Sequence, residues 1–315
     1  MVAYCSAVAT GLGVKSRGGR ARWRDLPAAV LMLLPSFAVI AVFVLYPLVQ
    51  AIWLGHMRCD AQGDQCRSNG WDQYIGVVRS NEFRHALIVT VKFALITVPV
   101  GLALGVGLVA LADKFVRGIG FFRAIFSSTV ATSVAVAGLM WWFLLEPRVG
   151  VLSNVGWIQR IFPVIKRPGL LYDSGTALPA VAASSIWAGL GFTFILVTAG
   201  LQSIPRDLHE AAVLDGAGGI RRFWSITVPL LGPTLLFVLI VLTAKAFQAY
   251  GEIDLLTAGG PRQATTTLTY LTYGSSSRIN TQDGLKAAVA VCLFVLLLAL
   301  SAVQVRVAGK RVHYG

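Results

Sequence analysis

Charged residues are scarce in this sequence. Only 13% of its 315 residues are Asp, Glu, Lys or Arg, whereas 56% are hydrophobic. A soluble domain carries roughly a quarter charged residues, so the composition excludes an ordinary soluble protein and indicates an integral membrane protein. The apolar runs are continuous and do not alternate with polar residues over about ten positions, which excludes a transmembrane β-barrel.

Signatures of nucleotide, metal and catalytic sites are also missing. The string nearest to a phosphate-binding loop is Gly11-Leu-Gly-Val-Lys15-Ser16, which has Val14 where that motif requires glycine, and no strand precedes it. Four cysteines form no metal pattern, and four histidines are scattered through loops and the tail. No Ser-His-Asp or His-Glu-x-x-His constellation is present. The chain is therefore expected to bind no ATP or metal itself and not to be an enzyme.

Long apolar runs make up most of the sequence. A helix needs about 20 apolar residues to cross the bilayer core, and six stretches meet this need. We therefore predict an all-α, polytopic membrane protein with six transmembrane helices. The predicted spans are 27–54, 86–112, 121–145, 178–202, 229–250 and 284–305. Basic, glycine-rich residues 1–26 form a predicted tail, residues 307–315 form a second tail, and a short interfacial helix is predicted at Val155–Val164.

The basic residues orient these spans. With both termini in the cytoplasm, the inner segments hold 14 Lys and Arg, whereas the outer loops hold ten that nine acids nearly balance. The positive-inside rule therefore predicts a multi-pass plasma-membrane protein with cytoplasmic N- and C-termini. The same short clusters beside the spans, with no continuous basic face, indicate contact with membrane lipid and no nucleic acid, despite the net charge of +13.

Two cysteines, Cys59 and Cys66, lie in the predicted first outer loop. A disulfide between them is possible if that loop faces an oxidising compartment, where such bonds persist. The sequence leaves open whether they pair.

The stretch between the fourth and fifth spans is unusually apolar for a loop. Pro205 suits the first turn of a helix, and the acidic side chains that follow favour its N-terminus. Gly216, Gly218 and Gly219 are expected to end this helix, after which Ile220, Phe223 and Trp224 form an apolar stripe. Two interpretations remain open: a docking surface for another protein, and a helix that lies on lipid headgroups with its arginines on phosphate.

A motif in this stretch resembles that of the bacterial ABC importer permeases. That family carries Glu-Ala-Ala, three residues, Gly, nine residues, then Ile-x-Leu-Pro. This chain has Glu210-Ala211-Ala212, then Gly216, then Ile226-Thr-Val-Pro229, with Val228 replacing Leu. The continuation Asp215-Gly216-Ala217 is similar to that of sugar-type importers. In the family this helix, called the coupling helix, inserts into a separate ATPase subunit.

A second resemblance lies after the fifth span. Thr257-Ala-Gly259-Gly260-Pro261, followed by Thr265-Thr-Thr-Leu268, is similar to a loop of the first of two paired permeases in sugar and glycerol-phosphate uptake. Together the two matches imply a permease domain over residues 27–306 with a cytoplasmic coupling loop at 204–228. They also imply three partners: a second permease that completes a heterodimer, an ATPase dimer that binds ATP and Mg, and an extracytoplasmic solute-binding protein.

Some residues of this chain carry the expected contacts. The resemblance and the local pattern assign ATPase coupling to Glu210, Ala211, Ala212, Asp215, Gly216, Ala217, Arg221 and Arg222. Charges inside the bilayer cost about 2.5–3.5 kcal/mol and are functional candidates, which points to Lys92 and Lys245. Candidate solute-pathway residues are Lys92, Lys245, Gln248, Tyr250 and Glu252. The alternatives are that Lys92 snorkels to the outer headgroups and that the other four form an interfacial anchor.

Basic groups along the path favour a phosphorylated solute, of the glycerol-3-phosphate or glycerophosphodiester kind, over a disaccharide such as maltose or trehalose. A membrane-embedded enzyme and a secondary transporter remain as other functional classes. The second is disfavoured because the two halves show no convincing repeat.

Overall fold

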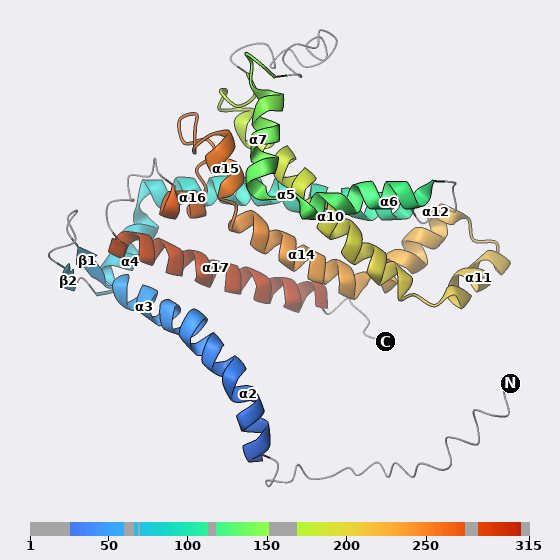
Figure 1. Cartoon of the computed structure of the whole chain (residues 1–315), viewed down its shortest axis with the longest axis horizontal. Helices are drawn as coiled ribbons and strands as arrows, with labels where there is room; N and C mark the ends of the chain where they lie inside the picture. The colour runs from blue at the N-terminus through green and yellow to red at the C-terminus, as the bar shows by residue number, and fades with distance from the viewer. Residues whose placement is uncertain are drawn as a thin grey trace. The chain divides into compact units, whose positions relative to one another are not determined.

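The computed structural model describes residues 26–59, 66–68, 70–112, 118–150, 169–274 and 283–309. Two units are distinguished, Met1–Gln50 and Ala51–Gly315, and each is considered by itself. The elements (Figure 1) are α2 (Leu26–Ile40), η1 (Ala41–Leu45), α3 (Tyr46–Leu54), β1 (Met57–Cys59), β2 (Cys66–Ser68), α4 (Asp72–Arg79), α5 (Asn81–Ala112), α6 (Ile119–Ser128), η2 (Thr129–Ala131), α7 (Val134–Leu145), α10 (Ala177–Gln202), α11 (Arg206–Leu214), α12 (Gly219–Arg222), η4 (Phe223–Thr227), α13 (Val228–Leu230), α14 (Gly232–Phe247), α15 (Gly251–Leu256), α16 (Leu268–Tyr273) and α17 (Asp283–Gly309).

The all-α, membrane-spanning architecture predicted from the sequence is confirmed. Four continuous helices are long and apolar enough to cross a membrane: Val30–Leu54, Asn81–Ala112, Ala177–Gln202 and Asp283–Gly309. The third and fifth predicted spans are each a pair of bent helices, so the described residues hold six spans if each pair counts as one. The sequence predicted the ranges of these two spans but not their bends.

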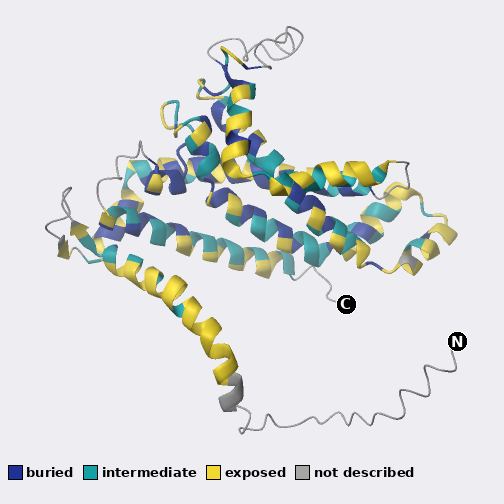
Figure 2. Ribbon diagram, in the orientation of Figure 1, coloured by how far each residue is buried: buried dark blue, intermediate teal, exposed yellow. Residues whose placement is uncertain are grey.

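The first predicted span contains a widened turn. Helices α2 and α3 are joined by the π-helical turn η1, in which the N–H of Tyr46 donates to the carbonyl of Ala41. Pro47 follows at once; it has no N–H to donate, and its ring would clash with a carbonyl in a regular α-turn. A π-turn relieves this conflict. From Val30 to Leu45 the side chains of α2 and η1 are almost all exposed and apolar (Figure 2), as a lipid-facing or partner-facing helix requires.

The bend in the third span lies at a run of hydroxyl residues. Helices α6 and α7 meet at 106°. Main-chain groups freed by such a break must find partners, because lipid offers none. The hydroxyls of Ser128 and Thr129 donate to the carbonyls of Ile125 and Phe126, at 2.7 and 3.1 Å. On the other side of the break, the hydroxyl of Ser133 accepts from the N–H of Val136 and so caps α7.

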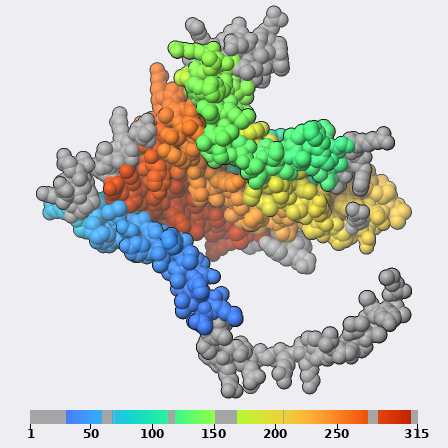
Figure 3. All heavy atoms as spheres, viewed as in Figure 1, coloured from blue at the N-terminus to red at the C-terminus, as the bar shows by residue number. Residues whose placement is uncertain are grey.

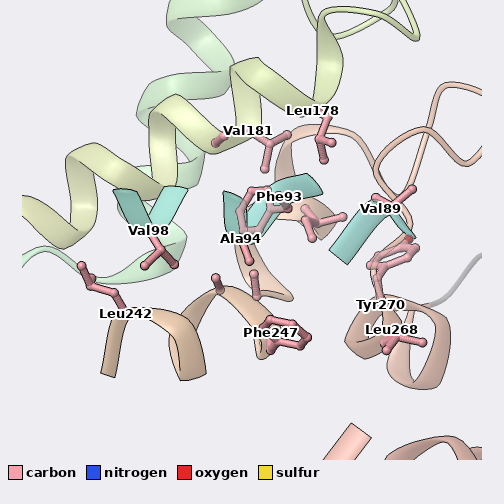
Figure 4. Close-up of a cluster of buried hydrophobic side chains, with 14 of the residues drawn as sticks. Val89, Phe93, Ala94, Val98, Leu178, Val181, Leu242, Phe247, Leu268 and Tyr270 are labelled. Atoms are coloured by element: carbon pink, nitrogen blue, oxygen red, sulfur yellow. The ribbon is translucent and has the colours of Figure 1, made fainter. Parts of the chain in front are cut away.

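Three helices form the centre of the second unit. Helix α5 packs against α10 and α14, and Figure 4 shows side chains of all three meeting around Phe93. Phe93, Val181 and Val238 are fully buried, one from each helix. Glycine permits the closest approach of α5 to α10, since a Cβ at Gly105 would overlap the side chain of Thr193. Close packing of this kind is typical of membrane helices, which associate through small residues.

The outer-loop predictions have mixed outcomes. Strands β1 and β2 pair in antiparallel fashion and place the Cα of Cys59 opposite that of Cys66. The side chains of both cysteines lie outside the described residues, so their disulfide stays a prediction. The interfacial helix predicted at Val155–Val164 also lies outside them.

In the loop between α7 and α10, the hydroxyl of Tyr172 donates to the Glu146 carboxylate at 2.7 Å, and this bond raises the pKa of Tyr172.

The packing of α5 predicts different outcomes at two glycines that lie two residues apart. Gly105→Ala should lower the thermal unfolding temperature of the detergent-solubilised protein, because the added methyl meets Thr193 and overpacking costs about 1–3 kcal/mol. Gly107→Ala is the matched control, since a Cβ there has no neighbour within 4 Å. Equal unfolding temperatures for the two variants would contradict the described contact between α5 and α10.

Candidate functional site

The segment 204–228 starts with a short helix whose ends match the sequence signals. Helix α11 begins at Arg206, directly after Pro205, and ends at Leu214. Gly216 then takes the left-handed conformation, with φ of +73°. The N–H of Ala217 donates to the carbonyl of Ala212 at 2.9 Å, and that of Gly216 to the carbonyl of Val213 at 3.0 Å. These two bonds form a Schellman motif, which satisfies carbonyls at the end of the helix.

The roots of this segment are buried in the body of the protein. Ile204 lies before α11, Thr227 is the last residue of η4, and Leu231 lies between α13 and α14; all three are buried. Gly200, near the end of α10, lies against Thr234 at the start of α14, where an added Cβ would fall 2.5 Å from Oγ1 of Thr234. The two helices that carry the segment are therefore packed against each other at its base.

The second half of the segment bends into α14. Turn η4 is π-helical, with the N–H of Val228 donating to the carbonyl of Phe223, and Pro229 follows it. This is the arrangement seen before Pro47. Across Leu231 the axis bends by 70° between Gly219–Leu230 and Gly232–Phe247. The segment thus joins α14 through a hydrogen-bonded π-turn followed by this bend.

Most of the segment's surface faces away from the rest of the chain. Among the eight residues predicted to couple, only Ala212 is buried; Ala217 and Arg222 are half-buried, and the other five, Glu210, Ala211, Asp215, Gly216 and Arg221, are exposed. Large apolar side chains are exposed beside them, with Leu214 at 89% and Ile220 at 81%. Exposed apolar surface rimmed by polar groups marks an interaction site. Figure 1 places α11 and α12 beyond one end of the long helices.

A separate small hollow lies between α5, α10 and α14. It is lined by Thr97, Gly101, Ser185, Ile186, Gly189, Thr193, Leu242, Lys245 and Ala246, and its volume is about 40 Å³. The Lys245 ammonium lies 4.3 Å from the centre of the Phe192 ring, a cation–π contact. The hydroxyls of Thr97 and Thr193 donate to carbonyls of their own helices, so their oxygens remain as acceptors.

The other pathway residues predicted from the sequence do not line this hollow. Lys92 is on the exposed face of α5, with Ile88 and Leu95. Helix α14 ends at Phe247 and α15 starts at Gly251, so Lys245, Gln248, Tyr250 and Glu252 do not lie on one helix. Gln248 is the exposed C-cap of α14, Tyr250 stacks on Tyr270, and Glu252 lies in the first turn of α15.

Sequence reasoning missed the hydroxyl residues of the hollow and the Phe192 ring beside its lysine. The signal for them is a pair of hydroxyls within the apolar fourth span, Ser184-Ser185, followed by Thr193 one residue after Phe192. Among the described residues, no three His, Cys, Asp or Glu side chains gather in a way that would hold a metal ion.

Comparison with known proteins yields a family match over most of the chain. Residues 74–314 match the family described as "Binding-protein-dependent transport system inner membrane component". The sn-glycerol-3-phosphate transport system permease protein UgpA of Agrobacterium fabrum is 38% identical over 290 residues, which is 90% of this chain and 96% of that protein. UgpA of Salmonella choleraesuis is 32% identical over 302 residues, or 94% and 97%.

Solved structures share the fold. A bacterial ABC transporter involved in the import of the acidic polysaccharide alginate matches with a TM-score of 0.75 and 21% identity, over 91% of this chain and 96% of that chain. The alginate transporter in complex with an alginate pentasaccharide-bound periplasmic protein matches with a TM-score of 0.72 and 21% identity, over 92% and 96%.

Proposed function

This chain belongs to the family of binding-protein-dependent transport system inner membrane components and is a non-catalytic permease subunit of an ABC importer; from that premise we propose that it forms half of the pathway for a glycerol-3-phosphate-like or glycerophosphodiester solute. The names of its relatives support this solute. The alternative is an uncharged disaccharide. Both solutes are small, polar and unable to cross lipid unaided.

Lys245 supports an anionic solute. It is the one cation among the residues that line the hollow, and its ammonium lies 4.3 Å from the centre of the Phe192 ring. No described carboxylate forms an ion pair with Lys245, whose side chain is exposed, so its ammonium is available to a phosphate. A hollow of about 40 Å³ holds a few water molecules at most. In the proposed cycle, α5, α10 and α14 separate to admit the solute and close again behind it.

Three partners complete the proposed importer. A second permease supplies the other half of the pathway, an extracytoplasmic binding protein delivers the solute, and an ATPase dimer binds ATP and Mg. Segment 204–228 lies on the cytoplasmic side in this proposal, with both chain termini, and α11 docks on the ATPase. Its exposed apolar side chains and its buried, glycine-packed roots support this role, since a force applied to α11 passes directly into α10 and α14.

Transport in this proposal depends on coupling through segment 204–228, and this coupling is tested at Gly216. Gly216→Pro should leave membrane insertion intact but abolish solute uptake while ATP hydrolysis continues, because proline is confined to negative φ and φ here is +73°. Glu210→Lys should act in the same way by reversing the charge of an exposed contact. Uptake and ATPase activity of the reconstituted importer are the measurements.

Gly218→Pro is the matched control. Its φ of −62° suits proline, and no neighbour lies within 4 Å of an added Cβ. This variant should transport at close to the wild-type rate. Wild-type transport by both Gly216→Pro and Glu210→Lys would remove the coupling role from the segment.

The solute is tested by comparing the two membrane lysines. Lys245→Met should reduce the efficiency of glycerol-3-phosphate uptake about tenfold, equivalent to about 1.4 kcal/mol, because the positive charge of the hollow is lost. Lys92→Met, which removes a lysine outside the hollow, should stay within about twofold. Labelled-solute uptake into proteoliposomes measures both. Unchanged glycerol-3-phosphate uptake by Lys245→Met, or uptake of a neutral disaccharide instead, would favour the alternative.

A further inference from the structure

Threonine hydroxyls hold the loop between α15 and α16 through hydrogen bonds within the loop. The hydroxyls of Thr257 and Thr265 lie 2.7 Å apart, and that of Thr265 also donates to the carbonyl of Gly260 at 2.8 Å. The hydroxyl of Thr266 donates to the carbonyl of Gly259 at 3.0 Å. Thr265 and Thr266 are buried. Such a network holds the loop in one conformation.

The same loop is tied to the end of α14 and to α5. The hydroxyls of Thr267 and Thr269 donate to the carbonyls of Ala249 and Phe247, at 3.2 and 2.6 Å. The N–H of Leu268 donates to the hydroxyl of Thr90 at 2.9 Å. One end of α14 therefore carries the proposed coupling segment, and the other end carries this loop. The 16 residues between them span roughly 24 Å.

Strained backbone at the tip presents two polar side chains. Arg262 and Gln263 have φ of +49° and +63°, and Ala258 has +48°. Left-handed backbone costs roughly 1–2 kcal/mol at each non-glycine residue, so the threonine network stabilises a conformation that these residues disfavour. The side chains of Arg262 and Gln263 are exposed. In Figure 3 this part of the chain, orange, stands out from the body of the second unit.

The tip contacts the start of α5 next to basic residues. His85 Nε2 lies 3.1 Å from the carbonyl oxygen of Gln263, and the chain neighbours of these two residues are Arg84 and Arg262. All three basic side chains are exposed. Neither arginine has a carboxylate partner among the residues that the structure describes. We name Arg84, His85 and Arg262 the tip patch.

We propose that the tip patch docks an acidic surface of the extracytoplasmic solute-binding protein. This inference rests on the proposed function, which places the end of α14 opposite segment 204–228 at the outer surface. Complementary charge steers and registers protein partners, and a preorganised loop lowers the entropy cost of docking. A rigid, strained tip fits one protein surface, whereas lipid headgroups require no fixed geometry. The hydrogen bonds from Thr267 and Thr269 to the carbonyls of Ala249 and Phe247 then connect the docking surface mechanically to the end of α14.

The test uses the complete importer in nanodiscs and its own binding protein loaded with sn-glycerol-3-phosphate. Arg262→Gly removes the charge while glycine adopts the left-handed backbone freely. The binding-protein concentration for half-maximal ATPase stimulation should rise about fivefold in Arg262→Gly and about twentyfold when Arg84→Gln is added. Basal ATPase activity should not change. Arg262→Lys keeps the charge and should remain within about threefold of wild type.

Salt and lipid separate the outcomes. Added salt should weaken the wild-type response more than that of the double variant, because screening acts on the removed charges. An unchanged half-maximal concentration in the double variant overturns the proposal. The proposal is also overturned if the variants lose a dependence of ATPase activity on anionic lipid that the wild type shows, while the binding protein still stimulates them as it stimulates the wild type. If the loaded binding protein does not stimulate the wild-type importer, the proposed function itself fails, and this docking surface fails with it.

Discussion

The bilayer leaves no main-chain donor or acceptor without a partner, and this constraint governs every place where the helices bend. A continuous helix satisfies itself, but a break exposes N–H and C=O groups to a medium that cannot bind them. In this protein, hydroxyl side chains and widened turns provide the missing bonds. Ser128, Thr129 and Ser133 serve the α6–α7 bend, and π-turns precede Pro47 and Pro229.

We expect helix breaks whose main-chain groups are hydrogen-bonded to hold the flanking helices rigidly, and the proposed transport depends on this rigidity. Segment 204–228 is rooted through Ile204 and Leu231 in two helices that touch through Gly200 and Thr234. The threonine loop at the other end of α14 is equally well bonded. In the proposed cycle, a displacement at one end of α14 would move the other end and the hollow beside Lys245. Alternating access, as proposed, needs this kind of rigid transmission more than it needs a flexible pore.

Hydropathy located every span because burial in lipid depends on summed apolarity, which a window of sequence measures directly. Summed hydropathy does not report the direction of a helix axis. The 106° bend at residues 129–133 was therefore not predicted, although the hydroxyls that support it are visible in the sequence. The helix end at Gly216 was predicted because a left-handed cap requires glycine. The Lys245 hollow depends on contacts among three helices, which no local pattern encodes. The predicted fifth span ran to residue 250, but α14 ends at Phe247, whose carbonyl accepts a hydrogen bond from the hydroxyl of Thr269.

The central claim is that α11 is a cytoplasmic contact for an ATPase, joined rigidly to the membrane spans. The most direct measurement places one cysteine at Leu214, which is 89% exposed, in a chain whose four native cysteines are replaced by serine. The account predicts that a membrane-impermeant maleimide labels this cysteine only from the cytoplasmic side, and that a short bifunctional reagent cross-links it to the ATPase subunit. Labelling of intact cells from outside, or no cross-link in an importer that transports, would contradict it.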